Sequence, residues 1–319
     1  MNDNDIDEIV KGIYLKEPRA IGRAISIIED GDQRADALLK QINARSIQES
    51  RILGITGPIG TGKSTIINQL IAYYRKQGCR VGIVAIDPSS PVSGGAFLGD
   101  RIRMMRHAMD KDVVVRSMAT RGKQGGLCAA ATAAVRIMIC SGCNPVIIET
   151  SGVGQTEIDV VRLADITVLV LAPGAGDEIQ AMKAGIIEIA DIVVVNKAEC
   201  PGADSLIMEL ENVLHQRSCP VCRVIAKEAY GIENLAASIE MIDNERRKSG
   251  QFTNKRKQTR ETEIIDCAIE MMRDELRSRL KECPENYTGD PRTIARKLID
   301  DICISGSYMP KRNHSEVFS

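Results

Sequence analysis

The stretch GPIGTGKST, residues 57–65, has the residue types that hold the phosphates of a nucleotide. It fits the pattern G-x-x-x-x-G-K-[ST] and lies between an apolar run, RILGIT, and a helical stretch, STIINQLIAYYRKQG. Its glycines let the backbone curl so that N–H groups converge on an anion, and a helix N-terminus adds positive charge at the same point. A glycine-rich turn that merely caps a helix is the alternative, but the preceding strand and following helix favour a phosphate loop.

Within this loop, Lys63 supplies a full charge for the β- and γ-phosphates, and the Ser64 hydroxyl is suited to Mg²⁺. The predicted phosphate contacts are Gly57, Gly60, Thr61, Gly62, Lys63, Ser64 and Thr65.

Acidic residues for a metal ion follow predicted strands. Glu149 ends NPVIIE, Asp87 ends VGIVAID, and Asp100 lies in the Ser/Pro/Gly-rich segment DPSSPVSGGAFLGDRIRM. Ligands of parallel sheets bind at the carboxyl ends of strands. We therefore predict Mg²⁺ ligands at Ser64, Asp87, Asp100 and Glu149. The long segment is predicted to be a switch that folds over the metal and γ-phosphate; an exposed loop with incidental acids is the alternative.

The segment TSGVGQTE follows Glu149 and has residues suited to the attack of water. Gly152 or Gly154 could bring a backbone N–H to the γ-phosphate, and Gln155 could orient the water. With Lys63, Asp87 and Asp100, Gln155 completes the predicted catalytic set.

The stretch VVVNKAEC, residues 193–200, has the residues of a guanine site. Asn196 can steady the loop and contact N7, and the stem of Lys197 can lie across the base. Glu199 can accept two hydrogen bonds from the guanine N1–H and 2-amino group, which adenine does not offer. In VIAKE, residues 224–228, the Ala226 N–H can meet O6. We predict binding of GTP and GDP, with a guanine preference softened by the extra methylene of Glu199.

Alternating apolar runs and helical stretches over residues 51–226 predict a doubly wound, mainly parallel α/β fold. The predicted strands are 52–56, 81–86, 113–116, 146–149, 166–171, 192–195 and 221–225. Residues 4–49 predict two or three helices with a break around Gly31. We divide the chain into a helical extension (1–49), a nucleotide-binding core (50–240) and a C-terminal helical arm with a frayed tail (241–319).

The arm has two regions of helical periodicity, 262–281 and 291–303. The charged stretch before them, 244–263, carries no apolar period, and the sequence leaves open whether it is a linker or a solvated helix.

Composition narrows the choice of partners. The 319 residues carry a net charge of −1 and few aromatic side chains, which argues against nucleic acid and anionic membranes. The acidic start has no targeting pattern and no run reaches membrane-spanning length, so a cytoplasmic protein with reduced thiols is expected.

Two C-x-x-C pairs stand out among ten cysteines, Cys140/Cys143 and Cys219/Cys222. Two such pairs can form a metal site, but in a doubly wound sheet their strands should lie several positions apart. Ordinary thiols are expected; a redox pair or a site shared across a dimer stays open. The three histidines match no ligand spacing.

The motifs in this order resemble those of the MeaB/ArgK family of GTPases. The matching stretches are GITGPIGTGKST, AIDPSSPVSGGAFLGDRIRM, RSMATRGKQGGL, ETSGVGQTE, LAPGAGDEIQAMKAGI and VVNKAE. The resemblance implies a GTPase core of the SIMIBI class, a dimerising C-terminal arm and Asp87, Asp100 and Glu149 around Mg²⁺. It implies slow hydrolysis, stimulated by an adenosylcobalamin-dependent acyl-CoA mutase that the protein serves as a chaperone, with the cobalamin adenosyltransferase as a second candidate partner. A third mobile loop would contain Asp177, Glu178, Gln180 and Lys183.

The sequence departs from the family at two positions and in its C-terminal third. Glu199 stands where the family usually has Asp, and Ala184 replaces a basic residue of the third loop. Beyond residue 240 only the helical character is similar. Two other functions stay open: a kinase that passes phosphate to an acceptor, and a metal-carrier protein in which nucleotide only holds a conformation.

Overall fold

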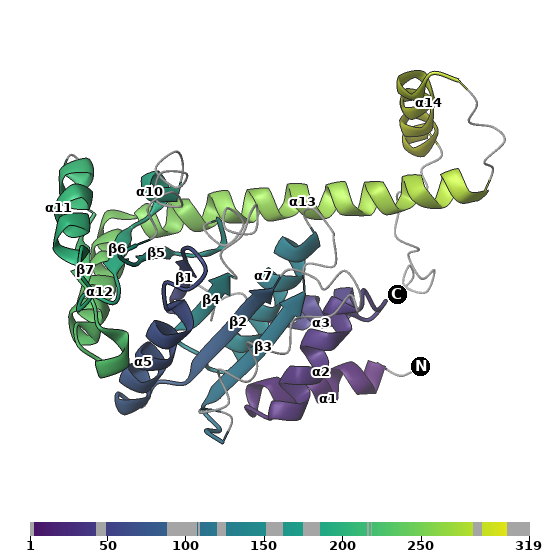
Figure 1. Ribbon diagram of the computed structural model, residues 1–319. Coiled ribbons are helices and arrows are strands. Elements are labelled where there is room, and N and C mark those ends of the chain that lie inside the picture. The colour runs from purple at the N-terminus through teal and green to yellow at the C-terminus, as the bar shows by residue number, and fades with distance from the viewer. Residues whose placement is uncertain are drawn as a thin grey trace. The chain divides into compact units, whose positions relative to one another are not determined.

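A seven-stranded parallel sheet forms the centre of the protein (Figure 1). The computed structural model describes residues 3–42, 49–87, 107, 109–119, 126–150, 162–174, 186–215, 217, 219–282 and 289–304. The strand order is β3-β2-β4-β1-β5-β6-β7. The strands are β1 (Ile52–Thr56), β2 (Val81–Asp87), β3 (Val113–Ala119), β4 (Val146–Thr150), β5 (Ile166–Leu171), β6 (Ile192–Val195) and β7 (Val221–Arg223). The fold class predicted from the sequence is confirmed.

The strands form where apolar runs are covered on both faces of the sheet. Every residue of β1, β4, β5 and β6 is buried, as expected for a parallel sheet between helices. The predicted bounds of β1, β5 and β6 are those observed. The strand β7 ends earlier than predicted, because Ile225 leaves the parallel ladder and pairs with Tyr230 in an antiparallel bridge.

Helices cover the two faces of the sheet in separate groups. On one face α5 and α12 pack on the side chains of Leu53 and Val168. On the other face α7 packs with the N-terminal helices over β2 and β4, and α10 and α11 form a separate cluster over β5 and β6. The helices are α1 (Asp3–Tyr14), α2 (Pro18–Glu29), α3 (Ala35–Gln41), α5 (Lys63–Lys76), α7 (Gly126–Cys140), α10 (Ile186–Ile189), α11 (Ala203–Leu214), α12 (Ile232–Ser249), α13 (Gln251–Glu282) and α14 (Pro291–Ile304), with a 3₁₀ turn, η2, at Ala226–Glu228.

The N-terminal segment forms the helices α1, α2 and α3, which share one apolar cluster with α7, β2 and β4. The predicted break falls between α2 and α3, where Gly31 has φ of +65°. Ile13, Ile21 and Ile25 are almost completely buried, so this segment is part of the core packing.

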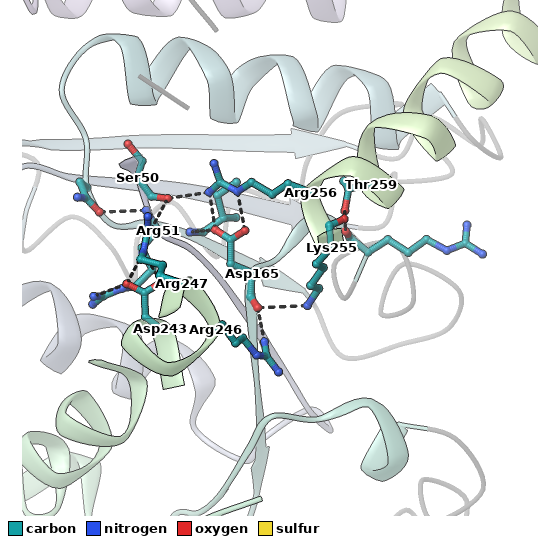
Figure 2. A network of polar contacts seen from close by, with 12 residues as sticks. Ser50, Arg51, Asp165, Asp243, Arg246, Arg247, Lys255, Arg256 and Thr259 are labelled. Carbon is teal, nitrogen blue, oxygen red and sulfur yellow. Dashed lines mark hydrogen bonds and ion pairs between the residues drawn. The ribbon is translucent and has the colours of Figure 1, made fainter. Parts of the chain in front are cut away.

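The charged stretch 244–263 is helical and belongs to α12 and α13, which meet at Gly250. Its basic residues bind acidic residues at the amino end of the sheet (Figure 2). The guanidinium of Arg256 donates from Nε and Nη2 to the carboxylate of Asp165, at 2.9 and 2.6 Å, and the Ile52 N–H donates to the same carboxylate at 2.8 Å. The stretch 244–263 is therefore not a linker. It is helical, and its basic side chains are partly buried against the sheet.

Two more ion pairs extend this network. Arg246 pairs with Asp191. Asp243 accepts from Arg51 and Arg247 (Figure 2). The ring of Phe252 lies under the guanidinium groups of Arg247 and Arg256, with 4.0 and 4.3 Å from each central carbon to the ring centre. Contacts of this kind are attractive because the ring face is electron-rich. The network therefore fastens the start of α13 to the strands β1, β5 and β6.

The chain divides into two compact units, residues 1–266 and 267–319. In the second unit, Asp290 caps the start of α14 by accepting from the N–H and hydroxyl of Thr293, and Leu298 and Ile302 are buried. Within the described part of the chain, none of the helices has the length and apolar character needed to cross a bilayer.

Candidate nucleotide-binding site

The phosphate loop joins the end of β1 to the start of α5, at the carboxyl edge of the sheet. Gly57, Gly60 and Gly62 have φ of +139°, +80° and +94°. A Cβ added at Gly57 would lie 2.1 Å from the Val170 carbonyl oxygen, and one added at Gly62 would lie 2.3 Å from Asn196 Nδ2. Glycine is required at both positions because left-handed backbone and close approach coincide there.

The lysine of the loop is buried and contacts the loop's own backbone. Lys63 Nζ donates to the carbonyl oxygens of Gly57 and Pro58, at 2.7 and 2.9 Å, and Thr61 Oγ1 also donates to Pro58, at 2.9 Å. The ammonium group is thus already inside the loop, where a phosphate oxygen would need it. Thr65 lies in the first turn of α5, whose N–H groups add to the positive end of the helix.

A pair of oxygen donors lies next to the lysine. Ser64 Oγ donates to Glu149 Oε1 at 2.6 Å, which joins the first turn of α5 to the end of β4. The Glu149 side chain is buried, although it is acidic. Hydroxyl and carboxylate oxygens are the donors that Mg²⁺ prefers, so this pair fits a magnesium ion.

The structure describes only part of the remaining predicted phosphate and metal residues. Asp87 is the last residue of β2, which pairs with β4, so its backbone lies at the same edge of the sheet as Glu149. Asp100, Gly152, Gly154 and Gln155 lie outside the described residues, as do the third-loop residues Asp177, Glu178, Gln180 and Lys183.

The predicted base site is joined to the phosphate loop by one side-chain amide. Asn196 Nδ2 donates to the Thr61 carbonyl at 2.8 Å, and Asn196 Oδ1 accepts from the Ala226 N–H at 3.1 Å. Asn196 is buried, whereas Lys197, with φ of +56°, and Glu199 are exposed in the turn after β6. A buried amide that bridges three chain segments holds the phosphate loop and the base loop in one arrangement.

Sequence reasoning missed Gln69. This residue of α5 donates from Nε2 to the Ala226 carbonyl at 2.9 Å. Its only signal in the sequence is a polar residue six positions after Lys63, in a helix with many apolar residues, and that pattern does not distinguish a glutamine in solvent from one that holds a loop.

The two C-x-x-C pairs lie apart, as predicted. Cys140 and Cys143 precede β4 and Cys219 and Cys222 flank the start of β7, with β1, β5 and β6 between the two strands. Burial raises the pKa of the Cys219 thiol to about 11 and also raises the pKa of Cys143 and Cys222. Thiols of raised pKa are protonated at neutral pH and react slowly.

The fold and the site together show to which class of protein the chain belongs. A parallel sheet with a glycine-rich phosphate loop after β1, an Asn-Lys turn after β6 and a supporting loop after β7 is the arrangement of a P-loop GTPase. A crystal structure titled LAO/AO transport system kinase has this fold, with a TM-score of 0.69 and 22% identity over 95% of this chain and 99% of that chain.

The sequence profile described as Methylmalonyl Co-A mutase-associated GTPase MeaB matches residues 19–285, so the chain belongs to the MeaB family. A chain of Pyrococcus abyssi named as a GTPase is 42% identical over 268 residues, 81% of this chain and 82% of the relative. The Mus musculus protein named methylmalonic aciduria type A homolog, mitochondrial, is 32% identical over 277 residues, 79% of this chain and 66% of the relative. The resemblance inferred from the motifs is confirmed.

Proposed function

We propose that the protein binds GTP with Mg²⁺ and hydrolyses it as a switch for an adenosylcobalamin-dependent acyl-CoA mutase. The observation that carries the nucleotide assignment is the Asn196 bridge between Thr61 and Ala226. It unites a phosphate loop and a base loop into one site. The family description and the name of the mouse relative support the mutase as partner.

Phosphate binding rests on the loop backbone, Lys63 and the Ser64–Glu149 pair. The Lys63 ammonium exchanges its contacts with Gly57 and Pro58 for phosphate oxygens. Ser64 and Glu149, with Asp87 and Asp100, are the residues that would hold Mg²⁺, which neutralises charge on the phosphate oxygens when it is bound. Because the lysine is buried, its attraction for the phosphates is weakly screened by water.

Hydrolysis uses water as the nucleophile. Gln155 orients that water and the Gly152 N–H contacts the γ-phosphate, while Lys63 and the loop N–H groups stabilise the charge that develops on the transferred group.

Base selection divides between two loops. Glu199 accepts from N1–H and the 2-amino group, the Ala226 N–H shares its hydrogen between Asn196 Oδ1 and guanine O6, and Lys197 covers the base.

The partner contacts are assigned to two other regions. Asp177, Glu178, Gln180 and Lys183 form the loop that reports the nucleotide state to the mutase, and the cobalamin adenosyltransferase is a second candidate partner. The arm, residues 241–319, is the homodimer interface. Large apolar side chains of α13 support this assignment, because Ile264, Ile265 and Ile269 are each at least half exposed.

The test is release of inorganic phosphate from GTP, measured with and without an adenosylcobalamin-dependent acyl-CoA mutase from the same cells. We expect slow release alone, faster release with the mutase, and GTP affinity lowered roughly 10- to 100-fold in Lys63→Ala, since a charge-assisted contact is lost. Transfer of the phosphate to an added acceptor would indicate a kinase instead. Stoichiometric zinc or nickel with negligible turnover beside the mutase would indicate a metal carrier. Either result would overturn the proposal.

A further inference from the structure

Gln69 connects the phosphate-binding helix to the back of the base loop. Its side chain is partly buried, and Nε2 donates to the Ala226 carbonyl oxygen at 2.9 Å. Ala226 begins the 3₁₀ turn η2 and is almost completely buried. Its carbonyl also accepts the Ala229 N–H, at 3.3 Å, so the shorter of the two contacts comes from α5.

The two peptide units on either side of the Ala226 Cα are each held by a side-chain amide. Asn196 Oδ1 holds the N–H of the unit before it, and Gln69 Nε2 holds the C=O of the unit after it. Fixing both units fixes the two backbone dihedrals of Ala226. The two amides together therefore hold the Ala226 N–H in one direction.

These contacts close a circuit of elements. Thr61 of the phosphate loop is bonded to Asn196 after β6, Asn196 to Ala226 after β7, and Ala226 through Gln69 to α5, which itself starts at Lys63. A displacement of the loop after β7 is therefore resisted from two sides. Glu199 lies in a different turn, and Gln69 makes no contact with it among the hydrogen bonds of the described residues.

We propose that Gln69 is a positioning residue for guanine recognition: by holding the Ala226 carbonyl it aims the Ala226 N–H at the O6 group of the base. The inference rests on the proposed function and adds a specificity role for a residue outside the phosphate loop and the Asn-Lys turn. It separates two components of base selection, recognition of O6 through Gln69 and recognition of the 2-amino group through Glu199.

The experiment compares Gln69→Met, which keeps the length of the side chain and removes the donor, with Gln77→Ala, an exposed glutamine at the end of the same helix. Dissociation constants are measured by calorimetry, with magnesium, for three diphosphates: GDP, inosine diphosphate, which lacks the 2-amino group, and 2-aminopurine riboside diphosphate, which lacks O6 and the N1–H. Each variant is compared with wild type for the same nucleotide, so the contact with N1–H does not enter the comparison. Melting temperatures are recorded for each variant.

We expect Gln69→Met to weaken the binding of GDP and of inosine diphosphate by about 5- to 10-fold each, the equivalent of one hydrogen bond. Binding of the 2-aminopurine nucleotide should weaken by less than about 2-fold. Gln77→Ala should match wild type. Gln69→Glu, which keeps the shape but sets an oxygen against the carbonyl, should give the same pattern and replaces Gln69→Met if that variant does not fold.

Equal weakening of all three nucleotides would assign Gln69 a purely structural role and overturn the inference. If the wild type binds GDP and Gln69→Met binds all three nucleotides with unchanged affinity, the inference is also overturned, and the proposed function stays intact. A wild type that binds no guanine nucleotide would overturn both.

Discussion

Asp165 is the buried centre of the network that fastens α13 to the sheet, and its removal should destabilise the protein strongly. Its carboxylate accepts from Arg256 at 2.9 and 2.6 Å and from the Ile52 N–H at 2.8 Å. The side chains of Asp165 and Arg256 are 4% and 16% exposed. The change Asp165→Ala leaves a guanidinium and a backbone N–H in a site that water scarcely reaches.

The cost follows from these contacts. Breaking a buried ion pair by removing one partner costs about 3–5 kcal/mol. Arg256 keeps the Ser50 carbonyl, at 2.7 Å, and the Phe252 ring, so the lower end of about 3 kcal/mol applies. The orphaned Ile52 N–H adds about 1 kcal/mol. We therefore expect the free energy of unfolding to fall by about 4 kcal/mol.

Urea unfolding followed by circular dichroism measures this loss. With a slope of about 2–3 kcal/mol per molar urea, the midpoint should fall by about 1–2 M. The matched control is Asp204→Ala, because Asp204 also pairs with an arginine, Arg223, but the side chains are 78% and 44% exposed. That change should cost less than about 1 kcal/mol.

The comparison has a clear refuting result. If Asp165→Ala and Asp204→Ala shift the midpoint equally, burial does not set the strength of these pairs and the network does not hold α13. Adding Arg256→Met to Asp165→Ala should restore part of the loss, because the uncompensated charge is removed.

Three further predictions concern the site and the thiols. Gly62→Ala should weaken GDP binding by more than about 10-fold, because the methyl group meets Asn196 and the backbone is left-handed. Gly60→Ala, with open space at its Cβ, should weaken GDP binding less. Equal effects in calorimetry would exclude the collision as the cause. Glu199→Ala should weaken GDP binding by about 10- to 100-fold and leave ADP binding unchanged. An equal loss of affinity for both nucleotides would contradict recognition of the base by this carboxylate. Burial raises the pKa of Cys219 to about 11. Its alkylation at pH 8.5, followed by mass spectrometry, should therefore be roughly 50- to 100-fold slower in native protein than in urea, and it should accelerate as the pH approaches 11. Equal rates in native protein and in urea would refute the raised pKa.

Much of the fold follows from local sequence patterns. The strands β1, β5 and β6 were predicted with their observed bounds, because each is a run of apolar residues between polar segments, and both faces of a parallel sheet are covered. The end of β7 was missed, since the bridge between Ile225 and Tyr230 depends on how the following turn closes.

The candidate site divides in the same way. The phosphate loop was located from its spacing, because glycines at fixed positions and a lysine are a local requirement of the backbone. The contacts of Lys63 with loop carbonyls and of Ser64 with Glu149 could not be read from the sequence, since Glu149 is 85 residues from Ser64 along the chain.

By itself, the sequence determined the order of the strands along the chain, the phosphate loop and the family, because these depend on residues that are neighbours or that recur in fixed motifs. Only the tertiary structure decided that the basic stretch 244–263 is helical and is joined to the sheet by ion pairs, and that Gln69 contacts Ala226. Arg256 and Asp165 are 91 residues apart, and Gln69 and Ala226 are 157 residues apart. A charged or amide side chain finds its partner through the packing of whole elements, and no local pattern records which partner that is.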